Sequence, residues 1–231
     1  MSDISKNLEA IKKKIEVAAI KSGRLPEDIK LLAVSKTIAP EIIQQAIDLG
    51  LTELGENKVQ EIMNKYDLLP QAQWHLIGHL QTNKVKYIID KVKLIHSVDS
   101  IKLAQEISKR AVQSGITMNV LVEINIGNEE SKHGVPIEQA EALAVEISKL
   151  DNITVKGLMT VAPFVENPEE NRKYFKQMKN LFIDIASKNY NNIFMEYLSM
   201  GMTNDYEIAI EEGANIVRIG TGLFGKRNYN I

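Results

Sequence analysis

A lysine that directly follows an apolar run is the residue with the clearest chemical potential in this sequence. Lys36 follows the segment Lys30–Ser35, whose apolar centre has the length of a buried strand. A lysine there is costly unless its charge is paired or its pKa is lowered. A desolvated, neutral amine can attack a carbonyl and form a Schiff base. A solvated lysine at a strand end is the alternative interpretation.

Two glycine-containing segments near the C-terminus could hold a phosphate group. They are Ser199–Asp205 and Arg218–Gly222, and we expect both to follow strands. The first precedes an expected helix, which Thr203 could cap, or Asn204 together with Glu207. Glycine lets the backbone approach an anion closely, and barrels often bind phosphate with the loops after strands seven and eight. Tight turns would also explain these glycines.

A Schiff-base lysine combined with a phosphate site indicates a phosphorylated aldehyde as ligand. Pyridoxal 5′-phosphate is a cofactor of this kind. A sugar-phosphate aldolase is the rival interpretation. Lys36 is an unusual choice for an aldolase, because it follows the first strand, beside the loops expected to close the barrel.

These residues depend on a regular alternation of strands and helices along the chain. After a first helix over Ile4–Lys21, which Ser2 or Asp3 could cap, eight strands follow, each but the last succeeded by a helix. We expect strands at Lys30–Ser35, Thr52–Leu54, Gln73–Ile77, Lys93–Ser97, Asn119–Asn125, Thr154–Met159, Phe194–Ser199 and Asn215–Ile219. We expect helices at Pro40–Gly50, Lys58–Tyr66, Thr82–Ile89, Ile101–Ser114, Ile137–Leu150, Pro168–Lys188 and Asp205–Glu211.

This alternation predicts an α/β fold: a single (β/α)8 TIM-type barrel with an extra N-terminal helix. A doubly wound open sheet is the alternative, because sequence periodicity does not show closure. We expect one domain over residues 1–231, with 225–231 as a tail.

The composition narrows the class of protein. The chain has 231 residues, 44% of them hydrophobic and 25% charged, which is typical of a globular protein. The formal net charge of −2 argues against a general nucleic-acid binder. The absence of cysteine excludes disulfides, thiolate metal sites and a catalytic cysteine. The sequence has no membrane-spanning run and no signal peptide, so we expect a cytoplasmic protein.

Three histidines, His75, His79 and His96, are candidate ligands. His75 and His79 are four residues apart, but no glutamate lies between them, so the zinc-protease motif is absent. We expect His75 and His96 to lie within strands, and His79 to lie at a strand end where it could approach a cofactor. No metal is expected.

Several motifs, taken together, resemble the YggS/PROSC family of pyridoxal phosphate homeostasis proteins. The longest is Trp74–Lys84, which reads WHLIGHLQTNK. The others match in order and spacing, and they are Ala33–Lys36, Leu54–Asn57, Leu198–Met202, Val217–Gly220 and Phe224–Gly225. The resemblance covers nearly the whole chain.

The resemblance implies a barrel like the N-terminal domain of alanine racemase, in which Lys36 holds pyridoxal 5′-phosphate as an internal aldimine. It implies phosphate contacts from Ser199, Gly201, Met202, Thr203, Gly220 and Thr221. It further implies a role in cofactor and amino-acid homeostasis without robust enzymatic activity, with pyridoxal-dependent apoenzymes as recipients of the cofactor. We expect a monomer, and a dimer remains the alternative.

The resemblance also implies that Arg218 faces the pyridine nitrogen of the cofactor. An arginine stays protonated at ordinary pH, so it should keep that nitrogen unprotonated and weaken the ring as an electron sink. Pairing of Arg218 with Glu123 or Glu196 is the alternative.

Four further residues have two interpretations each. Asn57 could bind the ligand or cap the following helix. Lys132, in the polar loop Gly127–Gly134, and the basic pair Lys226 and Arg227 could contribute a second cofactor site, or they could be a plain connector and a frayed tail.

A pyridoxal-dependent amino-acid racemase is the competing function. Racemisation by two bases needs a second acid/base group on the opposite face of the substrate. The resembling alanine racemases build that site with an added β domain, and this chain ends about ten residues after its last expected strand. We therefore expect a non-catalytic pyridoxal phosphate protein.

Overall fold

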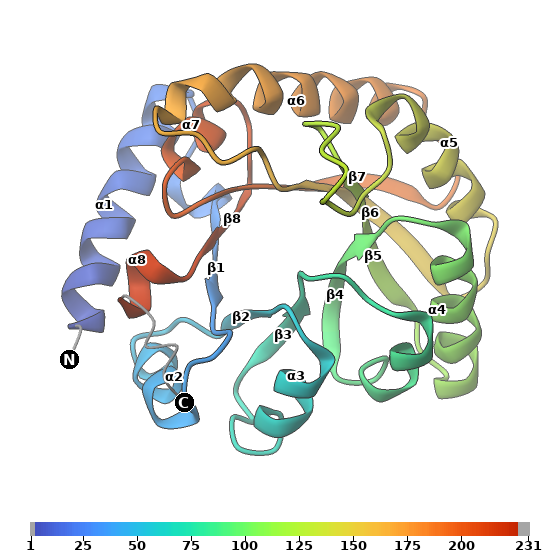
Figure 1. Ribbon diagram of the computed structural model, residues 1–231, viewed down its shortest axis with the longest axis horizontal. Coiled ribbons are helices and arrows are strands. Elements are labelled where there is room, and N and C mark those ends of the chain that lie inside the picture. Colours follow the sequence, from blue (N-terminus) through green and yellow to red (C-terminus); the bar gives the residue numbers. More distant parts are fainter. Residues whose placement is uncertain (1–2, 226–231) are drawn as a thin grey trace.

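In the computed structural model, which describes residues 3–225, eight parallel strands form a closed barrel surrounded by helices (Figure 1). The strands pair in chain order, and the last pairs with the first, with Leu32 opposite Arg218. This pairing confirms the predicted barrel and excludes the open sheet. The strands are β1 (Lys30–Val34), β2 (Glu53–Glu56), β3 (Gln73–Leu76), β4 (Val92–Val98), β5 (Met118–Ile124), β6 (Ile153–Thr160), β7 (Ile193–Met202) and β8 (Ile216–Ile219).

Helices and short 3₁₀ turns connect the strands. The helices are α1 (Ile4–Lys21), α2 (Pro40–Asp48), α3 (Val59–Lys65), α4 (Ile101–Ser114), α5 (Ile137–Ser148), α6 (Arg172–Ser187), α7 (Tyr206–Glu211) and α8 (Thr221–Phe224). The 3₁₀ turns are Pro26–Asp28, Thr82–Tyr87 and Pro168–Asn171. None of the helices in the described part of the chain is long and apolar enough to span a bilayer.

The N-terminal helix α1 lies outside the barrel and packs on α7 and α8 (Figure 1). Asp3 caps it, because its carboxylate accepts a hydrogen bond of 3.2 Å from the backbone N–H of Lys6. Its buried face includes Leu8, Ile11 and Ile15, spaced as an amphipathic helix requires. The extra helix is therefore as the sequence predicted.

Three connections differ from the expected pattern. The segment expected as a helix over Thr82–Ile89 is a 3₁₀ turn, held by i to i+3 bonds such as that from Ile88 N to Val85 O. Helix α6 begins at Arg172, because the buried Asn171 side chain turns inward to bind the carbonyl of Pro163. A short helix, α8, follows the last strand, where none was expected.

The expected cap of α7 is wrong. Neither Thr203 nor Asn204 caps it; the residue before the helix is Asp205, whose side chain makes no cap bond. The Asp205 carboxylate instead accepts hydrogen bonds from the backbone N–H of Met202, at 2.7 Å, and from the side chain of Asn171, at 2.9 Å. Tertiary contacts to a neighbouring loop outweigh the local capping preference here.

The barrel interior has an apolar part and a polar part. Its apolar cluster consists of Leu32, Leu94, Leu121, Met159 and Ile216. Polar side chains from β2, β3, β4, β7 and β8 occupy the rest, including the fully buried His96 and Ser199. The interior is therefore filled by side chains up to the mouth where the strands end.

Candidate functional site

A cavity of about 610 Å³ lies at the end of the barrel where the strands terminate. This volume is typical of a small-molecule site. The predicted site residues that line it are Lys36, Asn57, Met202, Thr203, Arg218, Gly220 and Thr221. Residues from both ends of the sequence therefore meet in one cavity, because β8 closes the barrel beside β1.

The other three predicted residues do not line this cavity. Ser199 is fully buried within β7. Gly201, on the same strand, has φ of 89°, and a Cβ there would lie 2.5 Å from that of Ala209. Glycine is thus required for close packing of β7 against α7. His79 borders a separate hollow, which shares Asn57 with the main cavity.

The backbone around Lys36 is held from both sides. Thr37 has φ of 64°, an uncommon conformation for a residue other than glycine, and its N–H donates to Glu61 at 2.6 Å. The hydroxyl of the buried Ser35 donates to Glu56 at 2.7 Å. Lys36 itself is half-buried at the cavity wall. The turn therefore fixes the position from which its amine enters the cavity.

The acidic groups beneath this turn share one buried cation. Lys65 donates to Glu56 at 2.8 Å, to Glu61 at 2.9 Å and to the carbonyl of Ser35 at 2.9 Å. Burial raises the pKa of Glu56 to about 7, although the Lys65 ammonium opposes that shift. The network ties α3 to the loop that carries Lys36.

Arg218 reaches the cavity from β8 and is 4% exposed. Its guanidinium donates to the Ser199 hydroxyl and to the carbonyl of Thr160, both at 2.7 Å. Burial lowers its pKa to about 10, while the charges of Asp205 and Glu123 oppose this. Arg218 therefore stays protonated at neutral pH.

The carboxylates proposed as alternative partners of Arg218 do not bind it. Glu196 pairs with Lys156 at 2.6 Å. Glu123 is buried, and its Oε2 atom has no hydrogen-bond partner among the described residues. Burial and then the charge of Asp99 raise the pKa of Glu123 to about 7, with Arg218 opposing them. Arg218 is thus held by neutral oxygen atoms.

The two expected phosphate loops contact each other at the cavity. The N–H of Gly222 donates to the Thr203 hydroxyl at 3.4 Å, so the loop after β7 touches the start of α8. The backbone N–H groups of Thr203 and Thr221 have no acceptor in the described part of the chain. Two donors next to the cavity are therefore available to an anion.

Lys132 also lines the cavity, from the polar loop after β5. Its amine donates to Glu129 at 2.5 Å and to the carbonyl of Ala162 at 3.2 Å. The titratable groups of the lining are thus the cations Lys36, Lys132 and Arg218 and the anion Asp205. This excess of positive charge favours an anionic ligand.

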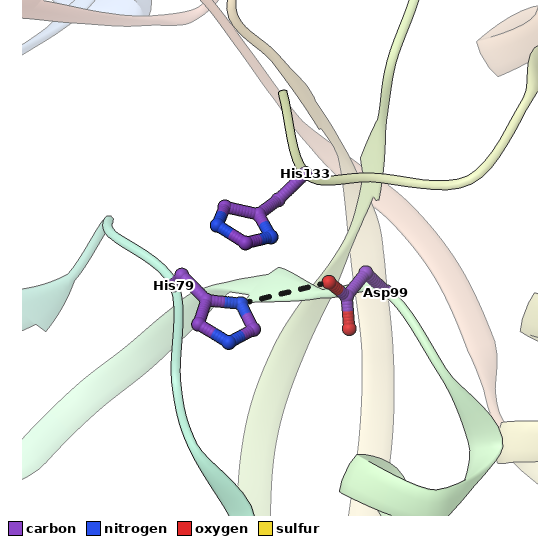
Figure 2. A group of neighbouring side chains, drawn as sticks. All are labelled: His79, Asp99 and His133. Carbon is purple, nitrogen blue, oxygen red and sulfur yellow. Dashed lines mark ion pairs between the residues drawn. The ribbon is translucent and has the colours of Figure 1, made fainter. Parts of the chain in front are cut away.

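His79 lies on the rim beside Asp99 and His133 (Figure 2). The two imidazole rings stack, with centroids 3.9 Å apart and planes 12° from parallel. Nδ1 of His79 is 3.7 Å from Asp99. A metal ion lies in the plane of each imidazole that binds it, so two parallel rings stacked this closely would have to reorient to share one.

These residues fit pyridoxal 5′-phosphate in the nature of their donor groups. An amine is present for the aldehyde, a guanidinium for the ring nitrogen, and free backbone N–H groups with a cationic surround for the phosphate. Asp205 and Asn171, which join the loop after β7 to the segment before α6, were not singled out as site residues. Their sequence signals, a helix-start aspartate and an asparagine after Pro168, are typical of ordinary turns.

Comparisons with known proteins agree with the expected family. Residues 6–228 match the family model described as alanine racemase, N-terminal domain. The pyridoxal phosphate homeostasis protein of Aquifex aeolicus is 48% identical over 224 residues, which cover 96% of this chain and 97% of that protein. Its namesake from Escherichia coli is 35% identical over 235 residues and covers 100% of this chain and 99% of its own length.

Solved structures agree with these matches. PipY of Synechococcus elongatus PCC7942, with pyridoxal phosphate bound, superposes with a TM-score of 0.83 at 30% identity, covering 96% of this chain and 100% of PipY. A protein from Bifidobacterium adolescentis, described only as an unknown protein, superposes with a TM-score of 0.91 at 36% identity, covering 96% of this chain and 97% of its own. Alanine racemase of Clostridium difficile shares the fold, with a TM-score of 0.70 at 21% identity over 99% of this chain and 57% of its own.

Proposed function

This chain belongs to the family of the alanine racemase N-terminal domain, and we propose that it binds pyridoxal 5′-phosphate on Lys36 and serves the homeostasis of that cofactor without robust catalysis. The observation that carries the proposal is the meeting of Lys36, Arg218, Thr203 and Thr221 in one cavity. The names of the relatives and the pyridoxal phosphate bound to PipY support it.

When bound, the cofactor would supply an aldehyde, and Lys36 is the residue whose side-chain amine would hold it. Backbone N–H groups of Thr203 and Thr221 would donate to the phosphate, and Gly220 lines the same cavity. Met202 and Asn57 border the same space.

Ser199 and Gly201 would act from outside the cavity. Ser199 holds the Arg218 guanidinium at 2.7 Å, and Gly201 permits the backbone turn that presents Met202 and Thr203. His79 would approach the ligand from the neighbouring hollow. In this proposal Ser199 and Gly201 act on the ligand through neighbouring residues, and His79 acts from outside the main cavity.

Arg218 is the reason to propose binding without catalysis. Its N–H groups donate and its proton is retained at neutral pH, so the ring nitrogen it faces would stay unprotonated. An unprotonated ring gives little stabilisation to a carbanion. In addition, no tyrosine or histidine lines the cavity within residues 3–225.

A racemase is kept as a second candidate because of Lys132. Its amine lines the cavity together with Lys36, and two-base racemisation needs a second acid/base group. The pairing of Lys132 with Glu129 at 2.5 Å favours a structural role, since the carboxylate already engages the amine.

We propose that the protein acts as a monomer and that apoenzymes dependent on pyridoxal phosphate receive the cofactor. The cavity lies at the end of the barrel, and two of its lining residues, Phe164 and Met202, are exposed, which suits loading and release.

The experiment that tests the proposal is reconstitution with pyridoxal 5′-phosphate, followed by borohydride reduction and peptide mass analysis. A visible absorption band, and a reduced pyridoxyl group on the peptide containing Lys36, are expected. A colourless protein, or a label on a different lysine, would refute the assignment.

A further inference from the structure

A continuous chain of hydrogen bonds crosses the barrel interior. Glu53 at the start of β2 binds Nε2 of His75 at 2.5 Å, and Nδ1 of His75 binds Nε2 of His96 at 2.9 Å. Nδ1 of His96 binds the Ser199 hydroxyl at 3.0 Å, and Ser199 binds Arg218 at 2.7 Å. We call these five side chains the interior column. It joins the N-terminal end of the barrel to the cavity.

The carboxylate at one end and the neutral imidazole rings fix the direction of the bonds. A carboxylate only accepts, so Glu53 accepts from Nε2–H of His75. Burial lowers the pKa of both histidines, so each ring is neutral at neutral pH and carries one proton. Nδ1 of His75 therefore accepts from Nε2–H of His96, and Nδ1 of His96 accepts from the Ser199 hydroxyl. The hydroxyl oxygen in turn accepts from the guanidinium of Arg218.

Charged neighbours support this arrangement at the Glu53 end. Lys93 donates to Glu53 at 2.8 Å, and both Lys93 and Lys30 disfavour a charge on His75. Burial is the largest cause of the lowered pKa of His75, while Glu53 opposes it. Burial is the largest single influence on the pKa of Glu53 and would raise it. The contacts of Glu53 with His75 and Lys93 together outweigh burial and lower the pKa to about 2.

At the Arg218 end, burial lowers the pKa of His96 well below its ordinary value, and His75 and Arg218 lower it further. Glu123 and Asp205 are the acidic groups whose charge acts on Arg218. Each acceptor atom of the column faces toward Arg218, so the bond dipoles stabilise its cation.

The interior column does more than occupy space inside the barrel. Five apolar side chains fill the adjoining part of the interior, beginning with Leu32 and Leu94, so apolar packing is available in this fold. A buried polar chain costs free energy relative to such packing, and it fixes one arrangement of its members. Of the five, Arg218 alone borders the cavity among the described residues.

We propose that Glu53, His75 and His96 are positioning residues that hold the Arg218 guanidinium through Ser199. Their effect on the cofactor, through the ring nitrogen that Arg218 would face, rests on the proposed function. Their effect on Arg218 itself does not, and it can be measured without any ligand.

The first test uses the ligand-free full chain and long-range ¹H–¹⁵N NMR of the histidine rings. His75 and His96 should both appear as neutral Nε2–H forms at pH 7 to 8, above the ordinary pKa of an imidazole. The bound Nη atoms of Arg218 should give separate, slowly rotating signals. A protonated ring or an Nδ1–H form at either histidine would overturn the proposal.

The second test compares three variants. His96→Leu removes a link and should merge the Arg218 Nη signals, whereas His96→Gln can donate and accept in the same order and should restore them. Leu121→Ala, in the apolar part of the interior, is the matched control for a general loss of packing, and should leave these signals separate. Merging in the control, or separate signals in His96→Leu, would contradict the positioning role.

The same variants are then titrated with pyridoxal 5′-phosphate. His96→Leu should weaken binding about tenfold or more and shift the pH dependence of the visible band, relative to His96→Gln and Leu121→Ala. An unchanged affinity and pH profile in His96→Leu would refute the link to the cofactor. If the unmodified protein failed to bind pyridoxal 5′-phosphate, the proposed function would be refuted. The NMR result on the ligand-free protein would still test whether the interior column positions Arg218.

Discussion

The ammonium of Lys65 on α3 lies 2.9 Å from the carbonyl oxygen of Ser35, the residue immediately before Lys36. The same ammonium neutralises the buried Glu56, whose Oε2 atom has no hydrogen-bond partner within residues 3–225. Helix α3 contributes no residue to the cavity lining, yet through this cation it holds the loop that presents the proposed ligand-binding lysine.

Replacing Lys65→Met should destabilise the fold by about 3–5 kcal/mol at pH 8, because it leaves Glu56 charged and unpaired in the interior. Protonation of Glu56 removes that charge, and its pKa is already raised to about 7. The loss should therefore be much smaller at pH 5. Chemical denaturation at the two pH values measures both losses, and the double variant with Glu56→Gln should recover stability at pH 8. An equal loss at both pH values would contradict this account.

Lys36→Ala should abolish both the visible band and the borohydride-stable label, because no amine then remains at the end of β1. Lys132→Ala is the matched control, since it removes the other lysine that lines the cavity among described residues. It should keep both signals. Absorbance and peptide mass spectrometry measure the outcome, and a persistent label in Lys36→Ala would assign the site elsewhere.

Gly220→Leu should weaken pyridoxal 5′-phosphate far more than pyridoxal, by about tenfold or more, because the side chain would occupy the space next to Thr203 and Thr221. Gly220 has φ of −111°, so the substitution places no left-handed strain on the backbone. Titration of both ligands by fluorescence measures the ratio. Equal losses would show that these loops do not recognise the phosphate.

Glu123→Gln should change how stability depends on pH. Burial raises the pKa of Glu123 from 4.5 to about 7, so between these values the folded chain binds more protons than the unfolded chain. Stability then falls as pH rises through this window, by about 3 kcal/mol for a shift of this size. The Glu123→Gln variant should lack this decrease in stability with rising pH. Denaturation curves from pH 4 to 8 measure the difference in unfolding free energy between the variant and the unmodified protein. A difference that does not change with pH would contradict the raised pKa of Glu123.

Exchange of the α-proton of amino acids in heavy water should stay well below about 1 per second, which is slow for an enzyme. The reason is that Arg218 would hold the ring nitrogen unprotonated. A panel of amino acids followed by NMR measures the rate, with the Lys36→Ala and Lys132→Ala variants beside it. Fast exchange that depends on both lysines would favour the racemase instead.

The alternation of strands and helices, and the order of the segments that form the site, could be predicted from the sequence. Short apolar runs ending in polar residues located β1, β7 and β8, and Lys36, Arg218 and Gly220 could be named because each follows or ends such a run. These are local properties: strand length, glycine and charge are visible within a few residues. The resemblance to a known family, carried by the same motifs, identified pyridoxal 5′-phosphate as the expected ligand.

Closure of the barrel, and the depth at which each site residue lies, depend on contacts between distant parts of the chain. Pairing of β8 with β1 joins residues from opposite ends of the chain, and no local pattern encodes it. Whether Ser199 borders the cavity or lies beneath it depends on the twist and stagger of strands in the closed barrel. The preference of Asp205 for Asn171 over a helix cap, and the meeting of Glu53, His75 and His96, also depend on long-range packing. Their physical cause is the same: a buried polar group must find its partner in space, and that partner is seldom near in sequence.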